Sequence, residues 1–210
     1  MILAVVGATG HTGGHVVTQA VARGYDVLAL ARRPAASTVG GSAVEERAVD
    51  VLDDEGLVKA LAGAEAVVST LGIGTSREPT VTYSQGVRNI LAAMSGNDIG
   101  RLVVTSAAPA GPREEQPFME RRVVMPILER FFGATYRDMR LMEATLRSSE
   151  IPWVALRPPR LLDKPATGAY RMALSPIRGA RSLTFADLAT ALLDALERPG
   201  LTGTALYVAN

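Results

Sequence analysis

The amino-terminal 33 residues constrain the fold of this chain more than any other segment. A short apolar run over residues 2–6 leads into the string GATGHTGG at residues 7–14, a helix-like stretch follows, and a second apolar run over residues 26–31 ends at Arg32 and Arg33. This pattern predicts a strand, a tight glycine turn, a helix and a second strand. Because such a unit binds the pyrophosphate of a dinucleotide, a nicotinamide cofactor is the first hypothesis about function.

The three glycines of the G-x-x-G-x-x-G spacing have different predicted roles. Gly7 permits the tight turn, Gly10 lets the backbone approach the pyrophosphate, and Gly13 lets the helix pack on the strand. Backbone amides at the start of the helix would then point at phosphate oxygens. The predicted phosphate-binding residues are Gly7, Thr9, Gly10, His11, Thr12 and Gly13.

The tip of the second strand indicates which dinucleotide is preferred. Arg32 and Arg33 stand where an NAD-specific protein usually offers a carboxylate to the ribose hydroxyls. A guanidinium would instead bind a 2′-phosphate, so we expect NADPH, with Arg32 the first candidate ligand. At two further strand tips, we expect Asp50 and Val51 to flank the adenine and residues 70–72 (Thr70, Leu71 and Gly72) to pass the ribose and phosphates.

Apolar runs alternate with helix-like segments along the whole chain, which predicts an α/β fold: a Rossmann-like, doubly wound parallel sheet in one domain over residues 1–210. The expected strands cover residues 2–6, 26–31, 44–49, 64–70, 101–106, 153–157 and 205–209. The expected helices cover residues 12–23 and 81–95, a short helix opened by residues 53–55, and a last helix from Thr184, with Asp187 at capping-box spacing.

Residues 107–135 depart from this alternation. A turn-rich stretch opens the segment, and an amphipathic helix is expected to follow, with the apolar residues Met119, Val123, Val124, Ile127, Leu128, Phe131 and Phe132. A long excursion after a central strand often forms a lid or a substrate wall, whereas a core element or a dimer face would show the same pattern. The chain could therefore be a monomer or a homodimer.

Composition narrows the function classes. There is no cysteine, so disulfides and thiolate chemistry are excluded, and His11 and His15 have no third partner that would suggest a metal site. No apolar run approaches the ~20 residues of a membrane span, so we expect no membrane contact. Residues 2–6 are too few for the core of a secretory signal, so we expect a cytoplasmic protein. Residues 101–181 hold 14 basic and 8 acidic residues, which suits an anionic small molecule, although a solvated arginine-rich surface would have the same composition. No nucleic-acid-binding module is recognisable.

Several motifs resemble the atypical short-chain dehydrogenase/reductase superfamily. They are the string GATGHTG at residues 7–13, S-x-G-x-R-N-I at 84–90, T-S-A at 105–107, the proline pair at 158–159 and T-G-A-Y at 167–170. Within the superfamily the chain is most similar to the biliverdin reductase B-like flavin reductases and related NAD(P)H-binding, NmrA-like proteins. This resemblance implies that the nicotinamide lies beside Thr105, Ser106 and Pro158, with Ser106 bonded to the substrate or the carboxamide.

The resemblance leaves the proton donor open. Members of the extended type carry a tyrosine acid with a lysine four residues later. Tyr136 and Arg140 have that spacing, but an arginine stands in place of the lysine and differs from it in shape. A flavin or another planar conjugated acceptor needs a positioned acid less than a ketone does, because charge spreads over its ring. Arg160, which replaces a histidine of the resembled group, could hold an anionic acceptor such as FMN or FAD.

Three hypotheses follow for function. The first is an NADPH-dependent reductase that transfers hydride to a planar conjugated acceptor, with Ser106, Tyr136 and Arg160 as candidate catalytic residues. The second is an NmrA-like regulator that senses NADP(H) without turnover. The third is an NADPH-dependent ketone reductase or epimerase of a biosynthetic pathway, using Tyr136 or Tyr170.

Overall fold

The computed structural model describes residues 1–34, 44–74, 76, 78–116, 118 and 120–210. The main sheet has eight strands in the order β3-β2-β1-β4-β5-β6-β10-β8, and only β8 runs antiparallel to its neighbour. The first six strands have the order of a dinucleotide-binding Rossmann sheet. Their bounds are β1 (Ile2–Val6), β2 (Asp26–Ala31), β3 (Val44–Ala48), β4 (Ala66–Ser69), β5 (Leu102–Thr105), β6 (Trp153–Arg157), β8 (Arg171–Ala173) and β10 (Thr204–Ala209).

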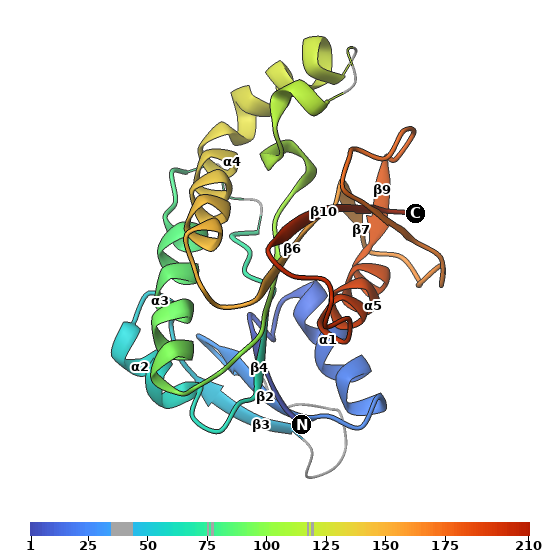
Figure 1. Cartoon of the computed structure of the whole chain (residues 1–210). Helices are drawn as coiled ribbons and strands as arrows, with labels where there is room; N and C mark the ends of the chain where they lie inside the picture. The colour runs from blue at the N-terminus through green and yellow to red at the C-terminus, as the bar shows by residue number, and fades with distance from the viewer. Residues whose placement is uncertain (35–43, 75, 77, 117, 119) are drawn as a thin grey trace.

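Helices cover both faces of this sheet (Figure 1). The helices α1 (His11–Ala22) and α5 (Phe185–Leu196) pack together on one face, and the helices α2 (Asp54–Ala60), α3 (Thr82–Gly96) and α4 (Met125–Arg147) lie on the other. Successive strand residues therefore enter two different apolar cores: Val103 joins the cluster under α1 and α5, whereas Leu102 and Val104 join the cluster under α3 and α4. Burial on both faces explains why these strands are almost entirely apolar.

Most predicted elements are present, with ends shifted by one or two residues, and three short strands were not predicted. The strands β7 (Arg160–Leu162) and β9 (Ser182–Thr184) form a separate parallel pair, and β8 pairs with β10 at the edge of the main sheet. Three residues are too few to show an apolar alternation, so only the pairing partner defines these strands.

The segment after β5 differs from its predicted outline. It begins with single turns, η1 (Ala108–Ala110) and η2 (Arg113–Glu115), and a π-helical turn, η3 (Glu120–Val124), leads directly into α4. Helix α4 extends past residue 135 to Arg147, and its later residues Met139, Met142 and Leu146 are buried toward the core. Met119, which was expected in this helix, lies outside the described residues.

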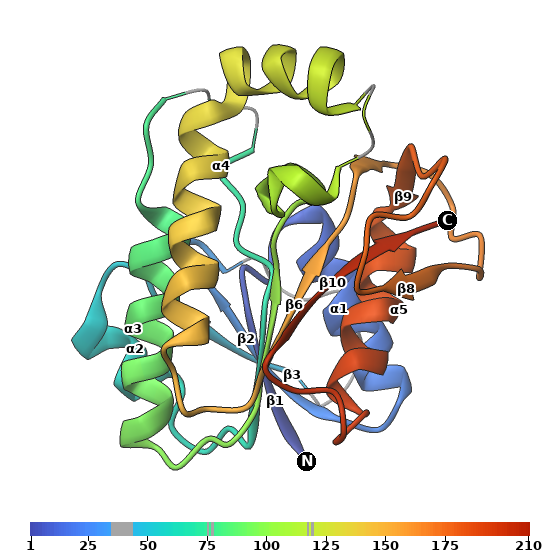
Figure 2. The ribbon, with the colours of Figure 1, turned by 45° about the horizontal axis from the view of Figure 1, so that its top comes forward.

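Figures 1 and 2 both show the described part of residues 108–124 beyond the carboxyl ends of the central strands. Helix α4 descends from there along α3, and the two helices are joined through Asp138. The buried Asp138 carboxylate accepts hydrogen bonds from the Tyr83 amide, at 2.9 Å, and from the Ser84 hydroxyl. A negative group at this position stabilises the amino end of α3. Within the described part of the chain, no helix is both long and apolar enough to cross a membrane.

Candidate functional site

The glycine loop connects β1 to α1 in the geometry that the sequence predicts. Gly7 has a φ of +85°, and its amide and that of Ala8 both donate to the Leu30 carbonyl of β2, at 2.9 and 3.1 Å. A Cβ atom on Gly13 would lie 2.1 Å from the Gly7 carbonyl oxygen. Only a glycine at position 13 therefore lets the first turn of α1 sit this close to the end of β1.

The amino end of α1 is open to a ligand. Its N-cap residue, Gly10, has no capping side chain, and the first turn contains no acidic residue. The amides of His11, Thr12 and Gly13 donate to none of the described residues. Thr9, Gly10 and His11 are exposed, whereas Thr12 is buried. Unfilled amides at a helix amino terminus form an anion site, so this loop fits the pyrophosphate of a dinucleotide.

The end of β4 contacts the glycine loop through Thr70. The Thr70 hydroxyl, just after β4, lies 3.1 Å from the Val6 carbonyl oxygen and 3.2 Å from that of Gly7. Because β1 and β4 lie at the point where the strand order changes direction, this contact is at the usual ligand position of an α/β sheet. Leu71 is half-buried, and a Cβ atom on the exposed Gly72 would have no neighbour within 4 Å.

Helix α3 brings two predicted cofactor segments together. A Cβ atom on Gly86 would lie 3.0 Å from both Leu71 Cδ1 and Val51 Cγ2, so glycine at this position allows both side chains to approach the helix. The Asn89 amide donates to the Val51 carbonyl at 3.0 Å and fixes the backbone there. The Asp50 carboxylate accepts from the Leu52 amide at 3.0 Å. The S-x-G-x-R-N-I motif thus positions the 50–51 and 70–72 segments.

Arg32 and Arg33 directly follow β2, the neighbour of β1, and both side chains are exposed. Neither guanidinium forms an ion pair with any residue that the structure describes. His11 of the glycine loop stacks on Phe185 of α5 with ring centroids 4.8 Å apart, and its Nδ1 is 3.9 Å from Asp163 Oδ2. The stack connects the loop to α5, and the contact with Asp163 connects it to the segment that follows β7. Within the described residues, no group of three or more metal-ligating side chains is present.

The ends of β5 and β6 hold a buried polar network that sequence reasoning only partly found. Ser106 Oγ donates to Glu143 Oε1 of α4 at 2.8 Å, and Arg157 of β6 grips the same carboxylate through Nε, at 2.9 Å, and Nη2, at 2.6 Å. Burial alone would lower the pKa of Arg157, but the hydrogen bonds and charge of Glu143 outweigh it and raise that pKa. Two signals in the sequence could have revealed this network. Arg157 ends an otherwise apolar strand, and Glu143 stands at a position of α4 where the helical spacing predicts a buried residue.

Thr105 and Pro158, the other two residues predicted to lie beside the nicotinamide, stand at the ends of the neighbouring strands β5 and β6. Residue 105 pairs with Leu156 across β5 and β6, and the Pro158 carbonyl accepts from the Ala108 amide at 2.8 Å. Thr105 Oγ1 is buried and has no hydrogen-bond partner among the described residues. An unpaired buried hydroxyl is costly, so a polar group of a bound cofactor would relieve this one. The residues present therefore fit a dinucleotide whose nicotinamide lies at the end of β5, next to Thr105.

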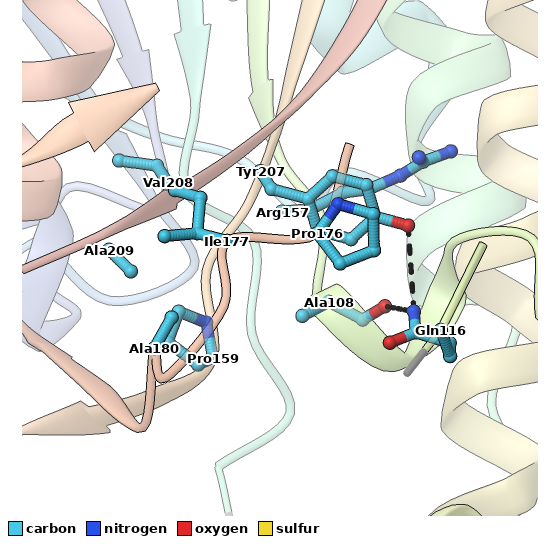
Figure 3. A pocket seen from close by; sticks show the side chains of 10 residues that line it. All are labelled: Ala108, Gln116, Arg157, Pro159, Pro176, Ile177, Ala180, Tyr207, Val208 and Ala209. Carbon is cyan, nitrogen blue, oxygen red and sulfur yellow. Dashed lines mark hydrogen bonds between the residues drawn. The ribbon is translucent and has the colours of Figure 1, made fainter. Parts of the chain in front are cut away.

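A small pocket opens on the other side of Arg157 (Figure 3). The Arg157 guanidinium lies 5.2 Å from the centre of the Tyr207 ring, and the Tyr207 hydroxyl donates to Glu115 at 3.2 Å and accepts from Gln116 at 3.5 Å. Burial raises the pKa of Tyr207 to about 12, although the Arg157 charge opposes the shift. The cavity volume of about 40 Å³ holds a few water molecules and is too small for a flavin ring. The lining residues are Ala108, Gln116, Arg157, Pro159, Pro176, Ile177, Ala180, Tyr207, Val208 and Ala209.

The candidate acids are placed differently from a tyrosine–lysine pair. Burial raises the pKa of Tyr136, whose ring lies 6.3 Å from that of Phe132. The Arg140 guanidinium turns to the Pro109 carbonyl, at 3.1 Å, and to Glu129, at 3.3 Å. Tyr170 donates to Asp194 of α5, and burial together with this carboxylate raises its pKa.

Arg160 begins β7, where it pairs with Ser182 of β9, and its side chain is exposed. It follows directly on the proline pair at 158–159, and Pro159 lines the small pocket. Ser106, Glu143 and Arg157 thus form a buried hydrogen-bonded network, whereas Arg32 and Arg160 are exposed.

Comparison with known proteins assigns the family. A family model described as NAD(P)H-binding matches residues 7–199. The uncharacterized protein YwnB of Bacillus subtilis is 22% identical over 208 residues, covering 95% of this chain and 93% of its own length.

Two solved structures show how far the fold is shared. An anaerobilin reductase of Escherichia coli O157:H7, ChuY, matches with a TM-score of 0.81 at 21% identity over 100% of this chain and 97% of its own. SP1627 of Streptococcus pneumoniae, described as a candidate NADH-flavin reductase, matches with a TM-score of 0.81 at 20% identity over 100% of this chain and 99% of its own.

Proposed function

The chain belongs to the NAD(P)H-binding family, and from this premise we propose that it is an NADPH-dependent reductase that transfers hydride to a planar conjugated acceptor such as a flavin. The glycine loop would hold the pyrophosphate through the unfilled amides of α1, and Arg32, assisted by Arg33, would hold the 2′-phosphate. Asp50 and Val51 would flank the adenine. Thr70 to Gly72 would pass the ribose, and Thr105, Ser106 and Pro158 would enclose the nicotinamide.

The choice of acceptor rests on one observation: the candidate proton donors are poorly placed to protonate a substrate. Ser106 donates its proton to Glu143, Tyr170 donates to Asp194, and burial raises the pKa of Tyr136. Ketone reduction places negative charge on one oxygen and is helped strongly by a positioned acid. A flavin spreads the charge over its ring and can take its proton from solvent, so it suits this site better.

The bound reduced nicotinamide would supply the hydride, and the chain's own residues would supply proximity and orientation. The acceptor would stack over the strand ends, covered by the described part of residues 107–135, with Arg160 attracting an anionic tail such as the phosphate of FMN. The likeness to a candidate NADH-flavin reductase and to an anaerobilin reductase supports an acceptor of this planar kind. The proposal places the protein in the cytoplasm, as a monomer or a homodimer.

The proposal is tested by mixing the protein with NADPH and FMN, riboflavin or menadione and following absorbance at 340 nm. We expect oxidation of NADPH with at least one flavin, faster than oxidation of NADH. NADPH binding without oxidation by any of these acceptors would contradict the proposal and favour the NmrA-like sensor. Loss of turnover in Tyr136→Phe, with full turnover in Ser106→Ala, would instead support the ketone reductase or epimerase.

A further inference from the structure

The buried network at the end of β5 fixes the direction of a hydrogen bond. Glu143 Oε1 accepts from Ser106 Oγ and Arg157 Nε, and Glu143 Oε2 accepts from Arg157 Nη2 and from Arg147 Nη2, at 3.1 Å. The exposed fractions of the Glu143 and Arg157 side chains are 1% and 5%. A carboxylate that receives three guanidinium bonds is ionised, and an ionised carboxylate can only accept.

The single proton of the Ser106 hydroxyl is therefore committed to Glu143. A serine oxygen has one proton to donate and two lone pairs that accept. Within the described part of the chain, no group donates to Ser106 Oγ, and the Ser106 amide is itself used by the Leu156 carbonyl at 2.7 Å. Toward any bound molecule, this serine offers lone pairs and no proton.

We propose that Ser106 is a hydrogen-bond acceptor in the site and that its partner is an amide-type N–H, with Glu143 and Arg157 as positioning residues that set this polarity. The inference rests on the proposed function, since it concerns what a bound dinucleotide and acceptor present to the end of β5. Two molecules could supply the N–H: the nicotinamide carboxamide, or a ring N–H of the acceptor, such as the imide of a flavin. Binding of a ligand that presents only a carbonyl oxygen would be disfavoured, because two acceptors would then face each other.

A comparison of matched ligands with and without the N–H tests this polarity. The cofactor arm measures by calorimetry the binding of NADP⁺ and of its 3-acetylpyridine analogue, which lacks the carboxamide N–H. The acceptor arm measures kcat/KM for riboflavin and for N3-methylriboflavin. In one of the two arms we expect the wild-type protein to favour the N–H-bearing ligand at least fivefold, and Ser106→Ala to abolish that preference.

Two further variants separate polarity from packing. Ser106→Thr keeps the hydroxyl and should keep the preference. Ser95 lies in α3 and donates to the Leu91 carbonyl at 3.1 Å, so Ser95→Ala should leave both arms unchanged. Glu143→Gln gives the serine a partner that can donate as well as accept, and it should weaken the preference with Ser106 intact. If Glu143→Gln fails to fold because Arg157 is left unpaired, the Ser106 variants alone decide.

The cofactor arm needs no turnover. If every acceptor fails and the reductase proposal falls, the cofactor arm alone decides, and the absence there of a preference that depends on Ser106 would overturn the inference. An unchanged preference in Ser106→Ala in both arms would overturn the inference. Stronger wild-type binding of the N–H-free ligand in both arms would overturn it as well, because it would mean that Ser106 donates. A preference lost in one arm only identifies which molecule supplies the N–H.

Discussion

At the scale of single residues, neighbouring glycines of the same motif have different reasons to be glycine. Gly13 and Gly14 are adjacent in the string GATGHTGG and look equivalent in the sequence. A Cβ atom on Gly13 would lie 2.1 Å from the Gly7 carbonyl oxygen, whereas on Gly14 the nearest atom would be 3.9 Å away, at ordinary contact distance. Only the first is required by the close approach of helix and loop.

We therefore predict opposite effects for two alanine substitutions. Gly13→Ala should cost about 1–3 kcal/mol of stability because the loop must move, and it should weaken NADPH binding at least tenfold. Gly14→Ala should leave binding intact and gain up to about 1 kcal/mol, since alanine is the better helix former. Urea unfolding and calorimetric titration of both variants check this. Equal effects at the two positions would contradict it.

A second residue-scale prediction concerns cofactor choice. Because both arginines after β2 are exposed and unpaired with described acids, Arg32→Ala should remove a charged hydrogen bond worth about 1.5–3 kcal/mol to the 2′-phosphate. The Kd for NADPH should rise about 10- to 150-fold, and the Kd for NADH should stay within a factor of two. Arg33→Ala is the matched control and should change the ratio less. An unchanged ratio in Arg32→Ala would remove this residue from the phosphate site.

At the scale of elements, Asp187 anchors the carboxyl-terminal part of the fold to α5. Thr184 caps this helix by accepting from the Asp187 amide at 3.0 Å, as the spacing predicts. The Asp187 carboxylate accepts from the amides of Thr167 and Gly168, at 3.0 and 3.1 Å, and from the Asn210 side chain at 3.1 Å. One buried carboxylate thus ties the T-G-A-Y stretch and the chain end to the start of a helix.

This anchor predicts a pH dependence of stability. Burial acts to raise the pKa of Asp187, but the hydrogen bonds from Thr167, Asn210 and Thr184 outweigh it and lower the pKa from 3.8 to about 2. A lowered pKa in the folded state means that the stabilisation, about 2 kcal/mol at 1.36 kcal/mol per pKa unit, is complete above pH 4 and lost as the pH falls toward 2.

Asp187→Asn should therefore lower the free energy of unfolding by about 1–3 kcal/mol at pH 7 and by less at pH 3. Urea unfolding at both pH values measures the difference. The exposed Asp26, at the start of β2, supplies the control Asp26→Asn, which should change stability little at either pH. A loss that is equally large at pH 3 and pH 7 would show that charge is not involved.

At the scale of the whole molecule, the sheet joins the two apolar cores into one unit. Leu102 and Val103 are consecutive in β5 and fully buried, yet they belong to different clusters. Loss of one core would expose the other through the shared strands, so a single cooperative unfolding transition is expected. The predicted ligand site spans β1, β4, β5 and β6, so it exists only while these strands of the sheet are folded together.

The dinucleotide should accordingly stabilise the entire protein. At a free concentration 100 times its Kd, NADPH should add about 2.7 kcal/mol, which for a chain of this length raises the Tm by about 5–10 °C. Thermal unfolding with and without NADPH checks this, and the protein should still unfold in one step. A second transition, or no shift with either NADPH or NADP⁺, would contradict the expected coupling.

The sequence alone predicted the individual strands of the sheet, the glycine turn and the capped last helix, because the signal for each lies within a few neighbouring residues. It also indicated Ser106 and the arginines after β2. Only the tertiary structure brought Glu143 and Arg157 onto Ser106, committed Arg140 to Pro109 and Glu129, and paired the three-residue strands. These contacts join segments that are distant in the chain, so no local spacing or periodicity predicts them. They decide which groups of the site donate hydrogen bonds and which accept them.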